Sequence, residues 1–507
     1  MRLDRRRLAD WSPYLVAVVI AALYAAFAPH TADLASQTAR EELFRRSGFV
    51  AFWWGWYSGI PSAEYSLLTP PLLGVFGAVG LGSLSIVATS LVVVPMLRDA
   101  VRPRAGAIAF VLAASLDVAS GRTTFAVGCV VALGAVLALE RGSVPLCAAL
   151  AALATVTSPV AGFLLLVAAV TVIIADVSRR AAAIGLGAGV VAALGLVALL
   201  SQGAAGYEPF SRSSLFMAVG TTAVVGLAPV GRRIRIAAGV TIAMLVGVFF
   251  VHSPLGANAT RIAVLAAAPT IVAASRLTQR HLMIAAGAVA AVLPIAQFHN
   301  DLYASTAKDT SRAFVAPLLD QLLVDPVTRD HRVEIVDTAT HWPSTYLLPK
   351  VVLARGWERQ IDEVRNPMFY GRGPLTAKTY RAWLNRNAVG AIAVPTGVPL
   401  DYGVTREAAL LKTGLPYLQL VWSDQHWQLY TVDQPRPIIA APAKVVRLTD
   451  TGLTLEVPSA GNYLLRMQWS QYLSVSGGTV IRRPNNQVEL SLSSSGLHQL
   501  RAVWRFG

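Results

Sequence analysis

Residues 98–141 read RDAVRPRAGAIAFVLAASLDVASGRTTFAVGCVVALGAVLALER, two apolar runs with arginines at their ends. A helix that crosses a bilayer needs roughly 20 mostly apolar residues. Such runs recur along the first 297 residues, in which arginine is the basic residue and lysine does not occur. The pattern predicts eleven membrane-spanning helices, near residues 12–28, 82–97, 106–120, 123–139, 143–157, 159–176, 181–200, 214–230, 236–252, 262–275 and 281–297.

The composition also predicts a polytopic membrane protein. Of 507 residues, 54% are hydrophobic and only 14% are charged, and the mean hydropathy is +0.53. A soluble protein of this size could not bury so much apolar surface. The net charge of +15 comes mostly from arginines at the ends of apolar runs, so it does not indicate nucleic-acid binding. The sequence has no P-loop, zinc motif or serine-hydrolase elbow, which argues against those chemistries.

The positions of the arginines also predict which loops face the cytoplasm, because cytoplasmic loops retain positive charge. The inner clusters are Arg2, Arg5, Arg6, Arg7, Arg98, Arg102, Arg104, Arg141, Arg179, Arg180, Arg232, Arg233, Arg235, Arg276 and Arg280. They place the N-terminus in the cytoplasm, and eleven crossings of the plasma membrane then place residues 298–507 outside. A crossing at residues 70–80 would reverse this order. We therefore expect that apolar segment to be a helix lying along the outer interface.

After residue 297 the chain becomes more polar and predicts two extracytoplasmic domains. Residues 298–436 alternate helical stretches with strand-like runs, which is typical of an α/β domain. The helical stretches are 314–323 and 377–387, and the strand-like runs are 332–336, 389–394 and 427–432. Residues 437–507 consist of short alternating strands with serine and glycine turns, which is typical of a small β-sandwich. The expected fold is thus a bundle of about eleven membrane helices followed by these two domains.

The first outer loop, residues 29–81, contains the candidate catalytic residues. Asp33 directly follows the first predicted span, where a carboxylate is suitably placed to take a proton from a hydroxyl. The alternative is that Asp33 caps a helix beginning at Leu34. Glu64 is the candidate second acid, with a structural role as its alternative. Aromatic candidates for stacking on a sugar, which could instead be interfacial anchors or core residues, are Trp53, Trp54, Trp56, Tyr57, Tyr65, His341 and Trp342.

Several motifs resemble those of the GT-C superfamily of membrane glycosyltransferases, most closely the YfhO-type and related actinobacterial membrane proteins. A single span is followed by a long outer loop that opens with Asp33 and ends in Tyr65-Ser-Leu-Leu-Thr-Pro-Pro-Leu72. Motifs similar to those of the actinobacterial group are Ser120–Phe125, Ser253–Arg261 and Arg355–Asp362. The stretch Trp469–Gly478 resembles the tryptophan- and glycine-containing hairpin that ends YfhO-type chains.

The resemblance implies an inverting glycosyltransferase that works at the outer face of the membrane. The donor would be a polyprenyl-phosphate-linked sugar, the acceptor a cell-envelope glycan or glycolipid, and Asp33 the general base. The resemblance does not identify a cofactor, but it is compatible with a divalent cation, Mg²⁺ or Mn²⁺. The sequence lacks a nucleotide-binding motif on the inner side, which favours a lipid-linked donor over a nucleotide sugar.

A polyprenyl phosphate leaves as an anion and needs positive charge nearby. Under this resemblance, the arginines predicted to face outward would bind the phosphate. They are Arg40, Arg45, Arg46, Arg122, Arg212 and Arg261. The alternative is that each arginine pairs with a local acid, such as Asp117 with Arg122 or Glu208 with Arg212, or extends to lipid headgroups.

Two other functions stay open at this point. A transporter or flippase for a lipid-linked glycan would have charges at mid-membrane depth and inverted repeats. The predicted spans have almost no charge away from their ends, and the chain has no internal repeat. A non-catalytic envelope scaffold would bind glycan through its β-sandwich. Substitution of Asp33 separates the three functions, because only an enzyme would lose glycosyl transfer while it keeps its fold and its donor binding.

Overall fold

The computed structural model describes residues 5–201, 206–348 and 350–504, and for residues 5–10 the backbone alone. The chain divides into two compact units. The helical unit consists of Met1–Gln37, Tyr65–Leu199 and Tyr207–Tyr303. The mixed unit consists of Thr38–Glu64, Leu200–Gly206 and Ala304–Gly507. Most of the first predicted outer loop up to Glu64 therefore folds with the C-terminal residues.

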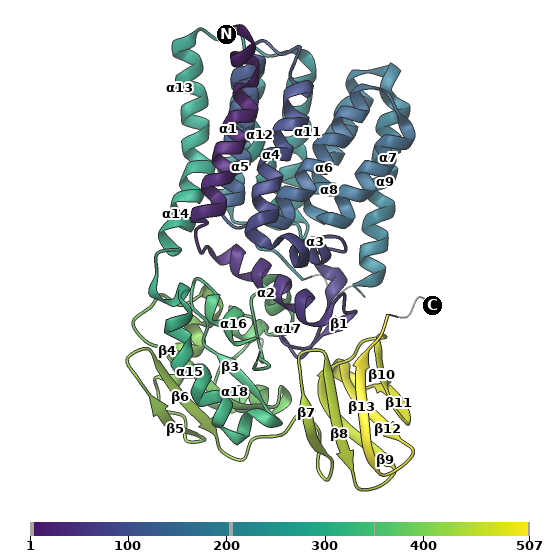
Figure 1. Cartoon of the computed structure of the whole chain (residues 1–507), viewed down its shortest axis with the longest axis vertical. Coiled ribbons are helices and arrows are strands. Elements are labelled where there is room, and N and C mark those ends of the chain that lie inside the picture. Colours follow the sequence, from purple (N-terminus) through teal and green to yellow (C-terminus); the bar gives the residue numbers. More distant parts are fainter. Residues whose placement is uncertain (1–4, 202–205, 349, 505–507) are drawn as a thin grey trace. The chain divides into compact units, whose positions relative to one another are not determined.

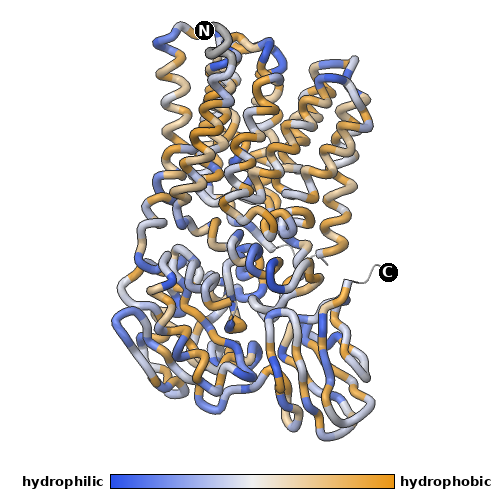
Figure 2. The backbone as a smooth tube through the Cα atoms, viewed as in Figure 1, coloured by the Kyte–Doolittle hydropathy of each residue, from blue (hydrophilic) through white to orange (hydrophobic). Residues whose placement is uncertain are grey.

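Every segment that was predicted to span the membrane is helical (Figure 1). Apolar residues dominate these helices (Figure 2), and helical hydrogen bonds pair the peptide groups, as a lipid environment demands. The helices are α1 (Arg5–Phe27), α3 (Thr69–Phe76), α4 (Ala78–Met96), α5 (Pro103–Ala119), α6 (Thr123–Glu140), α7 (Val144–Thr157), α8 (Pro159–Ala175), α9 (Arg180–Leu200), α10 (Arg212–Leu227), α11 (Arg232–Phe250), α12 (Arg261–Ala274), α13 (Gln279–Ala290) and α14 (Ala296–Ala304). The π-helical turn η4 (Ala291–Ile295) joins the last two.

Only some of these helices are long and apolar enough to cross a membrane. Within the described ranges, six segments are long and apolar enough to cross: Ala78–Met96, Thr123–Glu140, Val177–Leu200, Arg232–Phe250, Gly256–Ala274 and Gln279–Ala304. A seventh would combine Trp11–Phe27 with Ala32–Ser47, which are bent by 77°. The apolar helices α7, α8 and α10 are shorter. The helical state of the eleven segments and of residues 70–76 is thus confirmed, whereas eleven crossings stay a prediction.

Small residues let the helices of this unit pack closely, as membrane helices generally require. Gly106 of α5 faces α12, where an added Cβ would lie 2.4 Å from the Cβ of Ala273. Gly189 of α9 faces α7, where an added Cβ would lie 2.3 Å from the carbonyl oxygen of Ala148. Neither distance leaves room for a side chain, so these glycines set the separation of the two helix pairs.

The mixed unit contains a four-stranded sheet with the strand order β3-β4-β6-β5. The strands β3 (Arg332–Ile335) and β4 (Val389–Pro395) are parallel, and β6 (Trp427–Val432) pairs antiparallel with β4 and with β5 (Leu418–Ser423). The helices of this part are α15 (Arg312–Val324), α16 (Trp342–Leu347), α17 (Arg359–Arg365), α18 (Ala377–Arg386) and α19 (Thr405–Leu411). The predicted helical stretches and strands of residues 314–432 are therefore confirmed.

The remaining strands form two sheets, with the orders β10-β13-β8-β7 and β11-β12-β9. They are β7 (Lys444–Leu448), β8 (Gly452–Val457), β9 (Gly461–Gln468), β10 (Leu473–Val475), β11 (Gly478–Arg482), β12 (Gln487–Leu492) and β13 (Gly496–Ala502). Alternate residues of β9 and β12 are buried, as strands with one core-facing side require. Leu455 and Leu500 from one sheet and Leu465 and Leu490 from the other share a hydrophobic core. This is the packing of a β-sandwich.

The segment 38–64 contributes to both hydrophobic cores of the mixed unit. It includes most of α2 (Ala32–Ser47), the paired strands β1 (Phe52–Trp53) and β2 (Ile60–Pro61), and the short turn η1 (Ser62–Glu64). Trp53 and Trp56 belong to a core with residues of β3, β4 and β6, and Trp54 belongs to the sandwich core. The tryptophan cluster therefore anchors this segment within the mixed unit.

Candidate functional site

Asp33 lies in the first turn of α2 and pairs with an arginine of the α5–α6 turn. The Nε of Arg122 donates a hydrogen bond of 3.0 Å to Oδ2 of Asp33. Two more carboxylates contact the same guanidinium: Asp117 at 3.1 Å and Asp301 at 3.5 Å. The side chain of Arg122 is 8% exposed and that of Asp117 is 2% exposed, whereas Asp33 and Asp301 keep 35% and 30%. The cluster thus has a buried centre and two accessible carboxylates.

The local sequence explains why Arg122 meets Asp33. The α5 helix ends at Ala119 and α6 begins at Thr123, so only Ser120, Gly121 and Arg122 form the turn. Gly121 has a φ of +89°, which glycine adopts without strain. An added Cβ at Gly121 would lie 2.3 Å from the backbone nitrogen of Leu34. The glycine therefore lets this turn touch the start of α2.

In the structure, three carboxylates surround Arg122. Burial disfavours its charged form, but the carboxylates of Asp117, Asp33 and Asp301 outweigh that effect and raise the pKa of the guanidinium above its ordinary value. The positive charge of Arg122 is therefore already neutralised within the helical unit. The alternative of a local pair with Asp117 is confirmed, and Asp33 and Asp301 extend it.

Arg261 and Arg212 do not share these contacts. Arg261 begins α12, is partly buried, and has its guanidinium 4.6 Å from the ring centre of Phe125, three residues after Arg122. In the described part of the chain, Arg261 forms no ion pair with a carboxylate, so its charge is available. Arg212 is exposed at the start of α10.

An apolar cavity of about 840 Å³ lies within the helical unit. Its walls come from α1, α5, α12, α13 and α14, with residues such as Leu23, Leu112 and Phe298. The lining reaches Leu302, the neighbour of Asp301, and Pro29, four residues before Asp33. Because nearly all of the wall is apolar, the cavity suits a hydrocarbon chain.

The other charged candidates of the first loop lie in the mixed unit and are paired there. Arg40 is buried and forms an ion pair with Glu358. Arg45 pairs with Glu41 at 2.5 Å. Arg46 lies 3.4 Å from Glu42 and 2.9 Å from Asp450. Local pairing, the alternative to phosphate binding, accounts for these three arginines.

Glu64 belongs to the same buried group as Arg40 and Glu358. Burial raises the pKa of Glu64 well above its ordinary value, Glu358 raises it further, and Arg365 and Arg40 act in the opposite direction. Among the described residues, no hydrogen-bond partner reaches its buried Oε2. Burial and Glu358 therefore favour the protonated form of Glu64.

Burial contradicts the expectation that the loop tryptophans form a sugar-binding surface. Trp53, Trp54, Trp56 and Tyr57 are at most 2% exposed. A stacking platform must present a free ring face, and these rings pack within hydrophobic cores instead. The tyrosine hydroxyl of Tyr57 donates to the carbonyl of Gly356 and accepts from the backbone nitrogen of Glu358. Tyr65 differs, because it is 36% exposed and accepts a hydrogen bond of 2.8 Å from Gln37.

His341 and Trp342 are also buried, at 4% and 3% exposure, so neither offers a free ring to a sugar. His341 follows the carboxyl end of β3, stacks on Trp357 at 3.6 Å, and has its Nδ1 2.9 Å from Asp337. Its Nε2 lies 3.4 Å from Asp401. Burial lowers the pKa of His341, but the two carboxylates outweigh burial and raise it to about 9.

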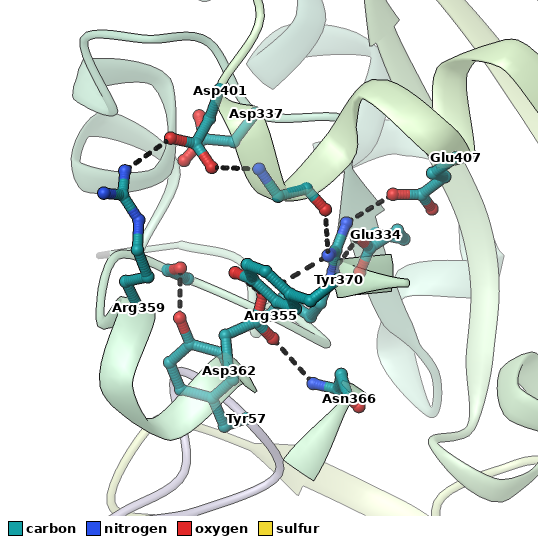
Figure 3. A network of polar contacts seen from close by, with 12 residues as sticks. Tyr57, Glu334, Asp337, Arg355, Arg359, Asp362, Asn366, Tyr370, Asp401 and Glu407 are labelled. Atoms are coloured by element: carbon teal, nitrogen blue, oxygen red, sulfur yellow. Dashed lines mark hydrogen bonds and ion pairs between the residues drawn. The ribbon is translucent and has the colours of Figure 1, made fainter. Parts of the chain in front are cut away.

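Sequence analysis did not predict a second buried ion network, which is centred on Arg355 (Figure 3). Its guanidinium contacts Glu334 at 2.7 Å, Asp362 at 3.3 Å and Glu407, and it stacks 4.0 Å from the ring centre of Phe369. Burial raises the pKa of Asp362, against the effect of Arg355. The only available signal was the motif Arg355–Asp362, which contains two members of the network. These contacts link β3, α17 and α19.

No arrangement in the described residues brings together three or more histidine, cysteine, aspartate or glutamate side chains in a way that could hold a metal ion.

Neither a family model nor a curated protein matches the sequence. Among solved structures, the chain is similar to ArnT from Cupriavidus metallidurans in the apo state, with 15% identity, a TM-score of 0.49 and coverage of 83% of this chain and 98% of that one. ArnT bound to undecaprenyl phosphate gives 14%, 0.44, 82% and 97%. The arabinofuranosyltransferase AftD from Mycobacteria gives 11%, 0.46, 99% and 60%. At these identities and scores, the likeness assigns no activity.

Proposed function

We propose that the chain is a membrane glycosyltransferase that transfers a sugar from a polyprenyl phosphate to a hydroxyl group of a cell-envelope glycan or glycolipid. The observation that carries the proposal is that the carboxylate of Asp33 is held by an arginine and is still accessible. Arg122 contacts its carboxylate at 3.0 Å, while 35% of the side chain stays exposed. A general base has to be oriented by its neighbours and must still reach its substrate.

In the proposed reaction, the acceptor oxygen attacks the anomeric carbon of the donor sugar on the face opposite the phosphate. The bond between that oxygen and the carbon forms as the bond between the carbon and the phosphate oxygen breaks. Asp33 takes the proton of the acceptor hydroxyl, and the configuration at the anomeric carbon inverts. The polyprenyl phosphate leaves as an anion, so it needs positive charge more than it needs a proton.

Two features of the helical unit support a lipid-linked donor. The apolar cavity of about 840 Å³ has the chemistry to take a polyprenyl chain. Arg261 is a predicted phosphate ligand that no carboxylate of the described chain neutralises, and it lies against Phe125 of α6. We assign the phosphate to Arg261, and Arg122 to the positioning of Asp33. Tyr65, which stays accessible, is the aromatic residue that we assign to the acceptor.

The arginine distribution supports the remaining parts of the proposal. It favours a cytoplasmic N-terminus and an extracytoplasmic location for the C-terminal residues. The reaction would then take place at the outer face of the plasma membrane, where envelope acceptors are found.

The test measures glycosyl transfer from a polyprenyl-phosphate-linked sugar by the purified full-length protein in detergent. Asp33→Asn should lower kcat by roughly 100-fold or more and leave the donor KM unchanged. The matched control is Asp99→Asn, which removes a carboxylate that is 91% exposed and should leave transfer unchanged. Full activity of Asp33→Asn would exclude Asp33 as the base. Donor binding without transfer in the wild-type protein would instead favour a flippase or a scaffold.

A further inference from the structure

A second cavity, of about 530 Å³, lies entirely within the mixed unit. Its walls come from Tyr57 and Ser58, from the α17 and η7 (Pro367–Tyr370) region, from the end of α18, and from β9 and the start of β12. The lining includes the arginines Arg365, Arg372, Arg386 and Arg466. Of the described residues, no aspartate or glutamate lines it. This lining is chemically unlike the apolar cavity of the helical unit.

Among the described residues, Arg365 interacts electrostatically with the nearby Glu64 and Glu358, whereas Arg386 and Arg466 have no carboxylate partner. Arg372 pairs with Glu363 at 2.9 Å. By contrast, Arg386 forms no hydrogen bond or ion pair with any described residue, and burial lowers its pKa. Arg466 donates only to the carbonyl of Pro437, at 2.7 Å, and burial and the nearby Arg436 lower its pKa. A negative ligand would therefore relieve both cations.

A third unneutralised guanidinium lies behind the cavity wall. Arg332 is 1% exposed, and its Nη1 donates to the carbonyl oxygens of Asn387 and Arg466, at 3.0 and 2.8 Å, two residues that line the cavity. Within the described residues, its Nε and Nη2 have no hydrogen-bond partner, and burial lowers its pKa to about 9. Burial of an uncompensated charge is costly. An anion in the cavity would offset part of that cost.

Polar amides complete the lining and suit hydroxyl groups. Asn485 and Gln487 line the cavity, and no described residue forms a hydrogen bond with either side chain. Each amide offers a donor and an acceptor, as sugar hydroxyls require. A volume near 530 Å³ is in the range of small-molecule sites and exceeds what a lone inorganic anion needs.

We propose that this cavity binds a saccharide that carries phosphate or carboxylate groups, as a segment of an anionic glycan would. Arg386 and Arg466 contact the acidic group, and Asn485 and Gln487 contact the hydroxyls. The site is separate from Asp33, and its existence does not depend on the proposed transferase activity.

Isothermal titration of the full-length protein in detergent tests the proposal with four probes: glucose 6-phosphate, galacturonate, glucose and inorganic phosphate. The two acidic sugars should bind more tightly than glucose and more weakly as salt is added. Arg386→Met and Arg466→Met should each weaken their binding about tenfold, which is roughly 1.4 kcal/mol. The matched control is Arg447→Met, which removes an exposed arginine of β7 outside the cavity and should have no effect.

A second pair of variants keeps the test decisive if an arginine variant fails to fold. Asn485→Ala and Gln487→Ala should weaken binding of glucose 6-phosphate and leave inorganic phosphate unaffected. Equal binding of inorganic phosphate and the acidic sugars would reduce the site to a simple anion site and overturn the proposal. Equal binding of glucose, or binding that the arginine variants do not weaken, would overturn it as well.

Discussion

Protonation of His341 should make the stability of the mixed unit depend on pH. The imidazole is 4% exposed and lies between Asp337 at 2.9 Å and Asp401 at 3.4 Å. Burial alone would lower its pKa, but these carboxylates outweigh burial and raise it from 6.5 to about 9. The charged form is thus favoured by folding.

The size of the change in stability follows from the shift in the pKa of His341. One pKa unit corresponds to about 1.4 kcal/mol, so a rise from 6.5 to about 9 corresponds to roughly 3 kcal/mol. Because the folded protein has the higher pKa, this stabilisation is fully present below pH 6.5. It disappears as the pH rises through 9.

Urea unfolding in detergent, followed by tryptophan fluorescence, measures this dependence for the wild-type protein and for His341→Gln. The wild-type protein should lose roughly 3 kcal/mol relative to the variant between about pH 6 and pH 10. The stacking of His341 on Trp357 is also lost in the variant, but that loss does not vary with pH. Asp337→Asn is the control, because it removes the nearest carboxylate and should remove most of the pH dependence. A difference between wild type and His341→Gln that stays constant over this pH range would refute the reasoning.

Three further predictions concern the two units. Arg122→Met should lower kcat by roughly 100-fold with little change in donor KM, and Arg122→Lys should recover part of it, because the arginine orients Asp33 and does not bind donor; a rise in donor KM alone would contradict this role. Gly287→Phe fills open space in the wall of the apolar cavity and should raise the donor KM about tenfold, roughly 1.4 kcal/mol, whereas Gly239→Phe, outside the cavity, should not. Glu64→Gln should become more stable relative to wild type as the pH rises above 4.5, because folding raises the pKa of this carboxyl group. Urea unfolding at several pH values measures the difference in stability, and a difference that does not change with pH would contradict this prediction.

Local patterns in the sequence were sufficient to predict where the helices and strands lie. Apolar runs of 14 residues or more, such as Val144–Thr157, stay helical wherever they pack, and alternation in Gln487–Leu492 is enough to specify a strand with one buried side. The tryptophans of residues 53–56 could not be placed in this way. An indole ring suits both a membrane interface and a protein core, and only long-range packing with residues such as Leu348 decides between them.

Long-range contacts also decide which charged residues pair with one another. From the sequence, Arg122 is near Asp117 alone, yet in the structure Asp33 and Asp301 also contact it, from positions 89 residues before and 179 residues after it. One guanidinium against three carboxylates leaves an excess of negative charge, which repels a phosphate. Under the proposed function, a donor phosphate would therefore lie away from this cluster, beside a cation that no carboxylate of the described chain neutralises, and Arg261 beside Phe125 meets that condition. Arg122 would then orient Asp33 as the proposed base, and Arg261 would contact the phosphate.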